Sequence, residues 1–201
     1  NMRYKRELLT SDRLIITDTY TNKKRTLVSK NSFGDFNISN DGKYVVSVGY
    51  LDTKVTIWDV DKQKVINEKF LHSNHIWCVA FSSDGQLIVT GDRDNMVNVW
   101  NLNTGLKVCS LFGHVNGVTG VQFYDNDSKI ISESYDCTVR FWDWRIGIYY
   151  TEKRIVHSGG LISNAINYEQ RFVSTADKNN VYIWNYDSGA LVRKISIAGT
   201  T

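Results

Sequence analysis

One four-residue pattern recurs along the chain at a fixed interval. Each copy ends in tryptophan, and consecutive copies are 42 residues apart, at Trp58, Trp100, Trp142 and Trp184. The Trp is preceded by Val, any residue and an apolar residue, as in VTIW and VRFW, and is followed by Asp or Asn. Similarity repeated at a period of about 20–50 residues is the signature of a repeat architecture. The chain is therefore expected to fold as a series of equivalent units.

Each unit divides into four short strands. The residues before the Trp alternate with period two, as a half-buried strand does. An apolar run such as LIVT precedes them, and an alternating stretch such as IWCVAF precedes that run. The turn between these two segments, SNDGK or SSDGQ, contains Asp-Gly, which suits a tight turn with positive φ. A polar turn and a fourth strand such as KVCSLF follow the Trp. Four-stranded sheets repeated every 40–45 residues or so are typical of β-propeller blades.

We therefore predict an all-β propeller of four-stranded antiparallel blades, with four full repeats plus one partial repeat. The partial repeat is 1–28, where RLIITD and RTLV match the third and fourth strands and a first strand is missing. The full repeats are predicted at 29–71, 72–113, 114–156 and 157–201, all within one propeller domain. Since a propeller needs about 4–8 blades, the chain is interpreted as a segment of a larger ring, with a closed five-bladed ring as the alternative.

Composition narrows the class of protein. The chain of 201 residues is 42% hydrophobic and 22% charged, which is ordinary for a soluble domain, and no apolar run approaches the roughly 18–20 residues of a membrane helix. Three cysteines without a CxxC motif favour a reducing, intracellular location, cytoplasmic or nuclear. No metal, cofactor or small-molecule motif occurs. The first thirty residues carry net charge +5, which leaves nucleic-acid binding open, although no stacking motif supports it.

The repeats resemble WD40 repeats over roughly residues 29–197, and rings of that family have seven blades most often. The resemblance implies a buried hydrogen-bond relay within each blade, built from a His before the first strand, a Ser or Thr on the second, an Asp in the next turn and the Trp. Two repeats carry the full set, which comprises His72, Thr90, Asp94 and Trp100, then His114, Ser132, Asp136 and Trp142. Two sets are incomplete, namely Ser47, Asp52 and Trp58, then His157, Ser174 and Trp184.

Ser, His and Asp in one repeat also match the composition of a hydrolase triad. However, the same residues recur at the blade period, whereas catalysis needs one site with an exposed nucleophile. The relay is therefore interpreted as structural, because it satisfies buried polar groups whose unpaired cost is about 1–3 kcal/mol each. No enzymatic activity is expected.

Function is expected where the repeats differ. In this family the upper face, formed by the turns before the first strand and after the second, commonly binds partners. The predicted partner-binding residues are Tyr50, His75, Trp77, Arg93 and Tyr135. Aromatic and Arg side chains are the usual interface anchors, although Trp77 has the alternative of packing against a neighbouring blade. The predicted function is a non-enzymatic scaffold in a multi-protein complex.

The segment WDWR suggests a second function. Asp143 and Arg145 stand in a Trp-Asp-x-Arg arrangement. This resembles the box of WD-repeat substrate receptors of cullin–RING ubiquitin ligases, in which the Arg on the lower face meets the ligase adaptor. The alternative prediction is therefore a ubiquitin-ligase substrate receptor with Asp143 and Arg145 at the adaptor contact.

Overall fold

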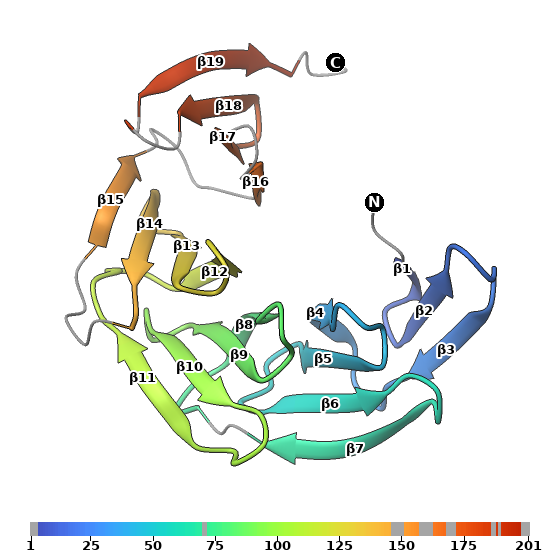
Figure 1. Ribbon diagram of the computed structural model, residues 1–201. Helices are drawn as coiled ribbons and strands as arrows, with labels where there is room; N and C mark the ends of the chain where they lie inside the picture. The colour runs from blue at the N-terminus through green and yellow to red at the C-terminus, as the bar shows by residue number, and fades with distance from the viewer. Residues whose placement is uncertain are drawn as a thin grey trace.

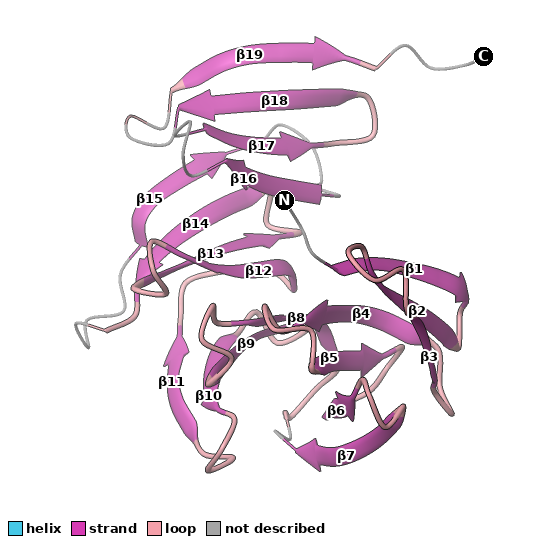
Figure 2. Cartoon of the chain, turned by 45° about the vertical axis from the view of Figure 1, so that its right-hand side comes forward, coloured by secondary structure: helices cyan, strands magenta, loops and turns pink. Residues whose placement is uncertain are grey.

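The regular elements in the described part of this chain are strands. The computed structural model describes residues 4–69, 72–145, 151–156, 163–167, 172–185, 188 and 190–197. In these residues the strands form five antiparallel sheets, which confirms the predicted all-β class (Figure 2). The described chain contains no helix of the length and apolar character needed to span a membrane.

Four of the sheets have four strands each, hydrogen-bonded in sequence order. Their strands are β4 (Phe33–Ile38), β5 (Tyr44–Gly49), β6 (Val55–Asp59) and β7 (Lys64–Lys69); β8 (Ile76–Phe81), β9 (Leu87–Asp92), β10 (Val97–Asn101) and β11 (Lys107–Leu111); β12 (Val118–Tyr124), β13 (Lys129–Ser134), β14 (Thr138–Asp143) and β15 (Thr151–Val156); and β16 (Ser163–Asn167), β17 (Phe172–Ala176), β18 (Asn180–Asn185) and β19 (Leu191–Ser196). Each sheet lies within one of the predicted repeats.

The fifth sheet has three strands, in the order β1, β2 and β3. β2 (Arg13–Asp18) and β3 (Lys24–Val28) are the two strands expected in the partial repeat. β1 (Tyr4–Thr10) was not predicted, and it pairs with β2 as the second strand of a blade would. Among the residues that the structure describes, this sheet has no strand equivalent to the first one of the other blades.

The five sheets follow an open arc (Figure 1). The first strand of each full blade lies on the inside of the arc and the fourth lies on the outside, and β8 contacts both β4 and β12. The β1–β3 sheet and the β16–β19 sheet lie apart at the two ends of the arc. The structure is therefore a partial propeller, and the alternative of a closed five-bladed ring is wrong for it.

The apolar core is divided among the interfaces between neighbouring blades. Trp142 and Phe123 pack with Val89 and Val99 of the preceding blade, and Trp100 packs with Val46 of the blade before that. Clusters of the same kind join Trp58 to the β1–β3 sheet and Trp184 to the β12–β15 sheet. Since each Trp covers the face of the neighbouring sheet, the 42-residue repeat is also the repeat of the core.

Two of the turns between first and second strands use the predicted glycine. Gly42 and Gly85 have φ of 72° and 69°, which confirms the Asp-Gly turn prediction. In the next blade Asp127 takes the equivalent place with a φ of 61°. Its carboxylate accepts hydrogen bonds from the backbone N–H and the hydroxyl of Ser83, in the turn of the preceding blade. A strained backbone position is thus joined to a contact between blades.

Candidate functional site

The blade β12–β15 contains a continuous chain of hydrogen bonds. The Trp142 indole N–H donates to Ser132 Oγ at 2.8 Å, and Ser132 Oγ lies 2.7 Å from His114 Nε2. His114 Nδ1 lies 2.9 Å from Asp136 Oδ2, and Asp136 also accepts from Thr138. Burial raises the pKa of Asp136, but hydrogen bonds from Thr138, His114 and Val115 outweigh it, so the net pKa is below its usual value. The four side chains expected in this relay are brought together.

The blade β8–β11 contains the same chain with one member exchanged. Trp100 donates to Thr90 Oγ1 at 2.9 Å, and Thr90 lies 2.9 Å from His72 Nε2. The carboxylate at His72 Nδ1 is that of Asp92, at 2.8 Å, and not that of Asp94. The prediction of Asp94 as a relay residue is therefore wrong.

The exchange has a local cause. Asp92 is the last residue of β9 and is only 2% exposed, so its side chain already fills the place beside His72. Asp94 is exposed and accepts instead from the Ser73 hydroxyl at 2.9 Å and the Asn74 amide at 2.8 Å. Asp94 thus fixes the turn that leads into β8. Asp136, which is 42 residues later, instead holds the histidine of its own blade.

The blade β16–β19 also departs from the repeat spacing. The Trp184 indole donates to Thr175 Oγ1 at 2.7 Å, whereas the repeat spacing pointed to Ser174. The turn between β17 and β18 is one residue shorter than its equivalent in the preceding blade, which shifts the facing hydroxyl by one position. His157 lies outside the described residues. In the blade β4–β7, Trp58 donates to Ser47 at 2.8 Å.

The chain of Ser132, His114 and Asp136 has the connectivity of a hydrolytic triad but not its accessibility. Ser132 is completely buried, and its Oγ already accepts the Trp142 indole N–H. A nucleophile must reach a substrate, so this hydroxyl cannot attack one in the folded state. The relay therefore acts as internal structure of the blade.

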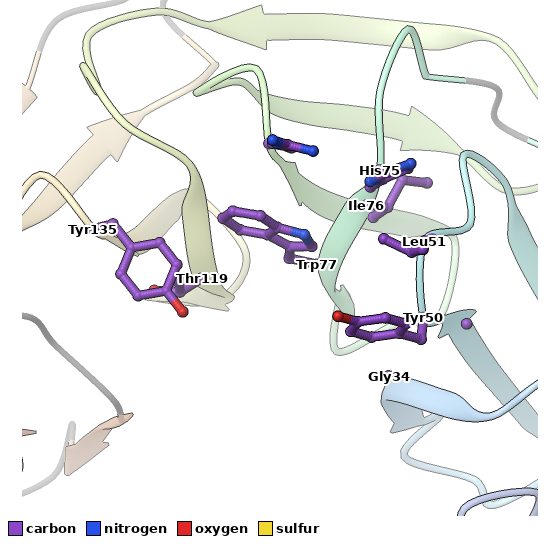
Figure 3. A pocket seen from close by; sticks show the side chains of 10 residues that line it. Gly34, Tyr50, Leu51, His75, Ile76, Trp77, Thr119 and Tyr135 are labelled. Atoms are coloured by element: carbon purple, nitrogen blue, oxygen red, sulfur yellow. The ribbon is translucent and has the colours of Figure 1, made fainter.

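A pocket of about 520 Å³ opens on the upper face, where three consecutive blades meet (Figure 3). All five residues predicted for partner binding line it. The complete lining comprises Gly34, Gly49, Tyr50, Leu51, His75, Ile76, Trp77, Arg93, Thr119 and Tyr135. The other five lining residues were not predicted, namely Gly34, Gly49, Leu51, Ile76 and Thr119.

Two repeated backbone features aim side chains into this pocket. The pairing of first and second strands shifts register at Gly34, Trp77 and Thr119, one in each blade. Such β-bulges leave one residue unpaired and can re-aim its side chain. All three unpaired residues line the pocket, Trp77 and Thr119 with their side chains and Gly34 with its backbone. The bulge explains why Trp77 leaves the core-facing alternation of β8.

The second feature is a hydrogen bond at the turn after each second strand. The N–H groups of Tyr50, Arg93 and Tyr135 donate to the carbonyls of Ser32, His75 and Gly117. These three donors therefore occupy equivalent places in their blades. The pocket residues differ in side chain while the backbone that holds them is the same.

Trp77 forms the centre of the pocket wall and also contacts the next blade. Its ring lies 5.5 Å from the Tyr135 ring, centroid to centroid, in an edge-to-face arrangement. It packs over the backbone of Gly117, and in Figure 3 it stands between Tyr50 and Tyr135. Tyr50 and Tyr135 are 75% and 52% exposed. Both interpretations of Trp77 thus apply, since one side contacts the neighbouring blade and the residue also lines the pocket.

The lower face contains the WDWR segment. The Trp144 indole N–H donates to the Asp127 carbonyl at 3.0 Å, and its ring packs edge-to-face on Phe123. Trp144 therefore braces the strained turn described above. Arg145 is exposed, with its guanidinium 5.4 Å from the centre of the Trp144 ring, and Asp143 is the partly buried last residue of β14.

The described residues contain no cluster of His, Cys, Asp and Glu side chains that could hold a metal ion. A model of the protein family described as "WD domain, G-beta repeat" matches the chain at residues 65–101 and 105–143. Each match spans the fourth strand of one blade and the first three strands of the next. The search of curated proteins found no match to this chain.

Proposed function

We propose that this chain, which carries WD40 repeats at residues 65–101 and 105–143, is a non-enzymatic subunit of a multi-protein complex that binds a protein partner in the upper-face pocket. WD40 repeats generally build protein-interaction scaffolds. The observation that carries the proposal is the convergence of Tyr50, Trp77, Arg93 and Tyr135, from three blades, on one pocket.

The exposure of the aromatic rings supports this proposal. Tyr50 and Tyr135 stay largely open to solvent, and the neighbouring Leu51 is 54% exposed. Large aromatic and Arg side chains dominate the binding energy of protein interfaces. These exposed side chains contribute little to the core of the blades. A partner that covers them would bury their apolar surface, which would stabilise the complex.

The architecture also favours binding over catalysis. Ser132 lies in a buried relay, and the pocket lining offers no Ser or Cys nucleophile. Cys78 and Cys109 are buried, which raises the pKa of both thiols and makes them poor nucleophiles. All three cysteines are unpaired thiols, which supports the proposed intracellular location.

The proposal is tested by affinity purification with mass spectrometry from the native source, using wild-type protein, Trp77→Ala and Leu106→Ser. Leu106 is exposed on the turn after β10, away from the pocket, and serves as the control. We expect Trp77→Ala to remain folded, with some loss of stability from its contact with the next blade, and to lose partners that wild type and Leu106→Ser retain. Equal recovery of the same partners by all three proteins would contradict the proposal.

Arg145 supports one alternative function, that of a substrate receptor for a cullin–RING ligase. Its guanidinium is exposed while the adjacent Trp144 is anchored in the blade, so Arg145 is free to meet a partner on the lower face. Co-purification of a cullin adaptor, lost in Arg145→Ala and kept in Arg193→Ala, would support this role. An adaptor that never co-purifies, or whose binding ignores Arg145, would remove it.

A further inference from the structure

The upper-face pocket has an uneven charge. Among its lining residues Arg93 is the one permanently charged side chain, and none is a carboxylate. Arg93 is exposed, and its guanidinium forms no ion pair with any residue that the structure describes. A guanidinium offers five N–H donors in a planar fork. The pocket therefore presents unused positive charge and hydrogen-bond donors to an incoming group.

The nearby carboxylates are already engaged by other partners. Asp94, next to Arg93 in the chain, accepts from Ser73 and Asn74, and these hydrogen bonds lower its pKa. Asp92 is held beside His72, and Asp52 lies against Gly49 and accepts from Asn31 at 3.4 Å. Each of these acids is directed into its own blade, so none neutralises Arg93 through a direct contact.

The walls beside Arg93 are aromatic. Tyr50, Trp77 and Tyr135 present rings to the space, and the volume lies within the roughly 300–1,000 Å³ of typical ligand pockets (Figure 3). In addition, His75 Nδ1 and Thr119 Oγ1 are buried without a hydrogen-bond partner among the described residues. The pocket thus combines apolar area, one cation and unused polar groups.

We propose that the partner is a peptide segment that places an anionic side chain on Arg93 and an adjacent apolar or aromatic side chain against Trp77. This inference rests on the proposed function and specifies its partner. The bidentate fork of Arg fits a carboxylate and a phosphate equally well, so Glu, Asp and a phosphorylated residue share the required chemistry.

The experiment selects a random peptide display library on the whole purified chain. We expect enriched peptides to contain Asp or Glu directly beside an apolar or aromatic residue. Synthetic versions of an enriched peptide, with the acid as Glu, Gln or phosphoserine, then separate the carboxylate from the phosphate and from a neutral isostere. We expect Gln to weaken binding about 10-fold or more, in line with the loss of a charge-assisted hydrogen bond.

Matched variants distinguish a failure of the acidic-peptide inference from a failure of the proposed function. Arg93→Gln should lose affinity for the acidic peptide as strongly as the Gln peptide does, whereas Arg193→Gln, an equal charge change on exposed β19, should not. Peptides that need Trp77 but show no acidic preference would overturn this inference alone. A library without enriched peptides, or with peptides indifferent to Trp77→Ala, would overturn the pocket's proposed function and this inference with it.

Discussion

Trp77 occupies space that only a glycine at position 117 leaves free. A Cβ built on Gly117 would lie 2.2 Å from Cζ3 of the Trp77 ring, far inside van der Waals contact. The two residues belong to neighbouring blades, and Gly117 also accepts the N–H of Tyr135. One glycine therefore sets the position of the central aromatic side chain of the pocket.

Gly117→Ala should displace the Trp77 ring and weaken partner binding. Because the ring is partly exposed it can move, so we expect a loss of stability near the low end of the roughly 1–3 kcal/mol typical of overpacking. Near-UV circular dichroism would report the altered Trp environment, and peptide affinity the altered pocket. Val115→Ala, at an exposed residue in the same turn, is the control. Unchanged spectra and affinity in Gly117→Ala would show that Trp77 does not depend on this contact.

Asp92 and Asp94 should differ sharply in their contribution to stability. Asp92→Ala removes the carboxylate from Nδ1 of His72, whose side chain is 1% exposed, so we expect it to lower the free energy of unfolding by about 1–3 kcal/mol. Asp94→Ala removes exposed hydrogen bonds to Ser73 and Asn74 and should cost less than about 1 kcal/mol. Urea titrations of both variants give the comparison. The opposite order of effects would return Asp94 to the relay.

This pair shows where sequence spacing stops being informative. The 42-residue period located the Trp positions and the strands of the four full repeats, because period-two alternation and repeated turns are properties of local sequence. The five predicted pocket residues came from the resemblance to WD40 repeats, which implies a partner-binding upper face. The period could not choose between two Asp residues two positions apart, since that choice depends on which carboxylate the strand end buries. The same limit applies to Thr175, where one residue fewer in a turn moves the facing hydroxyl. The short motif GDRD, with one Asp at the strand end, was the available signal for Asp92.

Trp142→Ala should be among the most destabilising single substitutions. The side chain is 1% exposed, packs in the interface between blades and donates to Ser132. We expect a loss of about 3–5 kcal/mol in the free energy of unfolding, measured by chemical denaturation. Trp184→Ala, at a partly buried position of the repeat, should cost less. A melting curve unchanged by Trp142→Ala would contradict its place in the core.

Acid should remove part of the stability through Asp136. Its pKa is lowered in the folded protein from the ordinary value of 3.8, so its ionised form stabilises the fold above that value. This contribution declines as the pH falls through the lowered folded pKa. We therefore expect the stability difference between wild type and Asp136→Asn to be constant above about pH 5 and to shrink toward pH 3. Denaturant titrations at several pH values measure it, and a difference independent of pH would refute the assignment.

The bulges at Gly34, Trp77 and Thr119 separate the residues that face the pocket from those that hold the blades together. The residue unpaired at each bulge takes no part in the indole–hydroxyl pairs, so it can change identity while those pairs stay as they are. The bulge positions and the turn positions of Tyr50, Arg93 and Tyr135 form a set of pocket residues whose side chains differ while their backbone geometry repeats. A different peptide specificity would then be designed by substituting these pocket residues in each blade, while the residues that hold the fold together are kept.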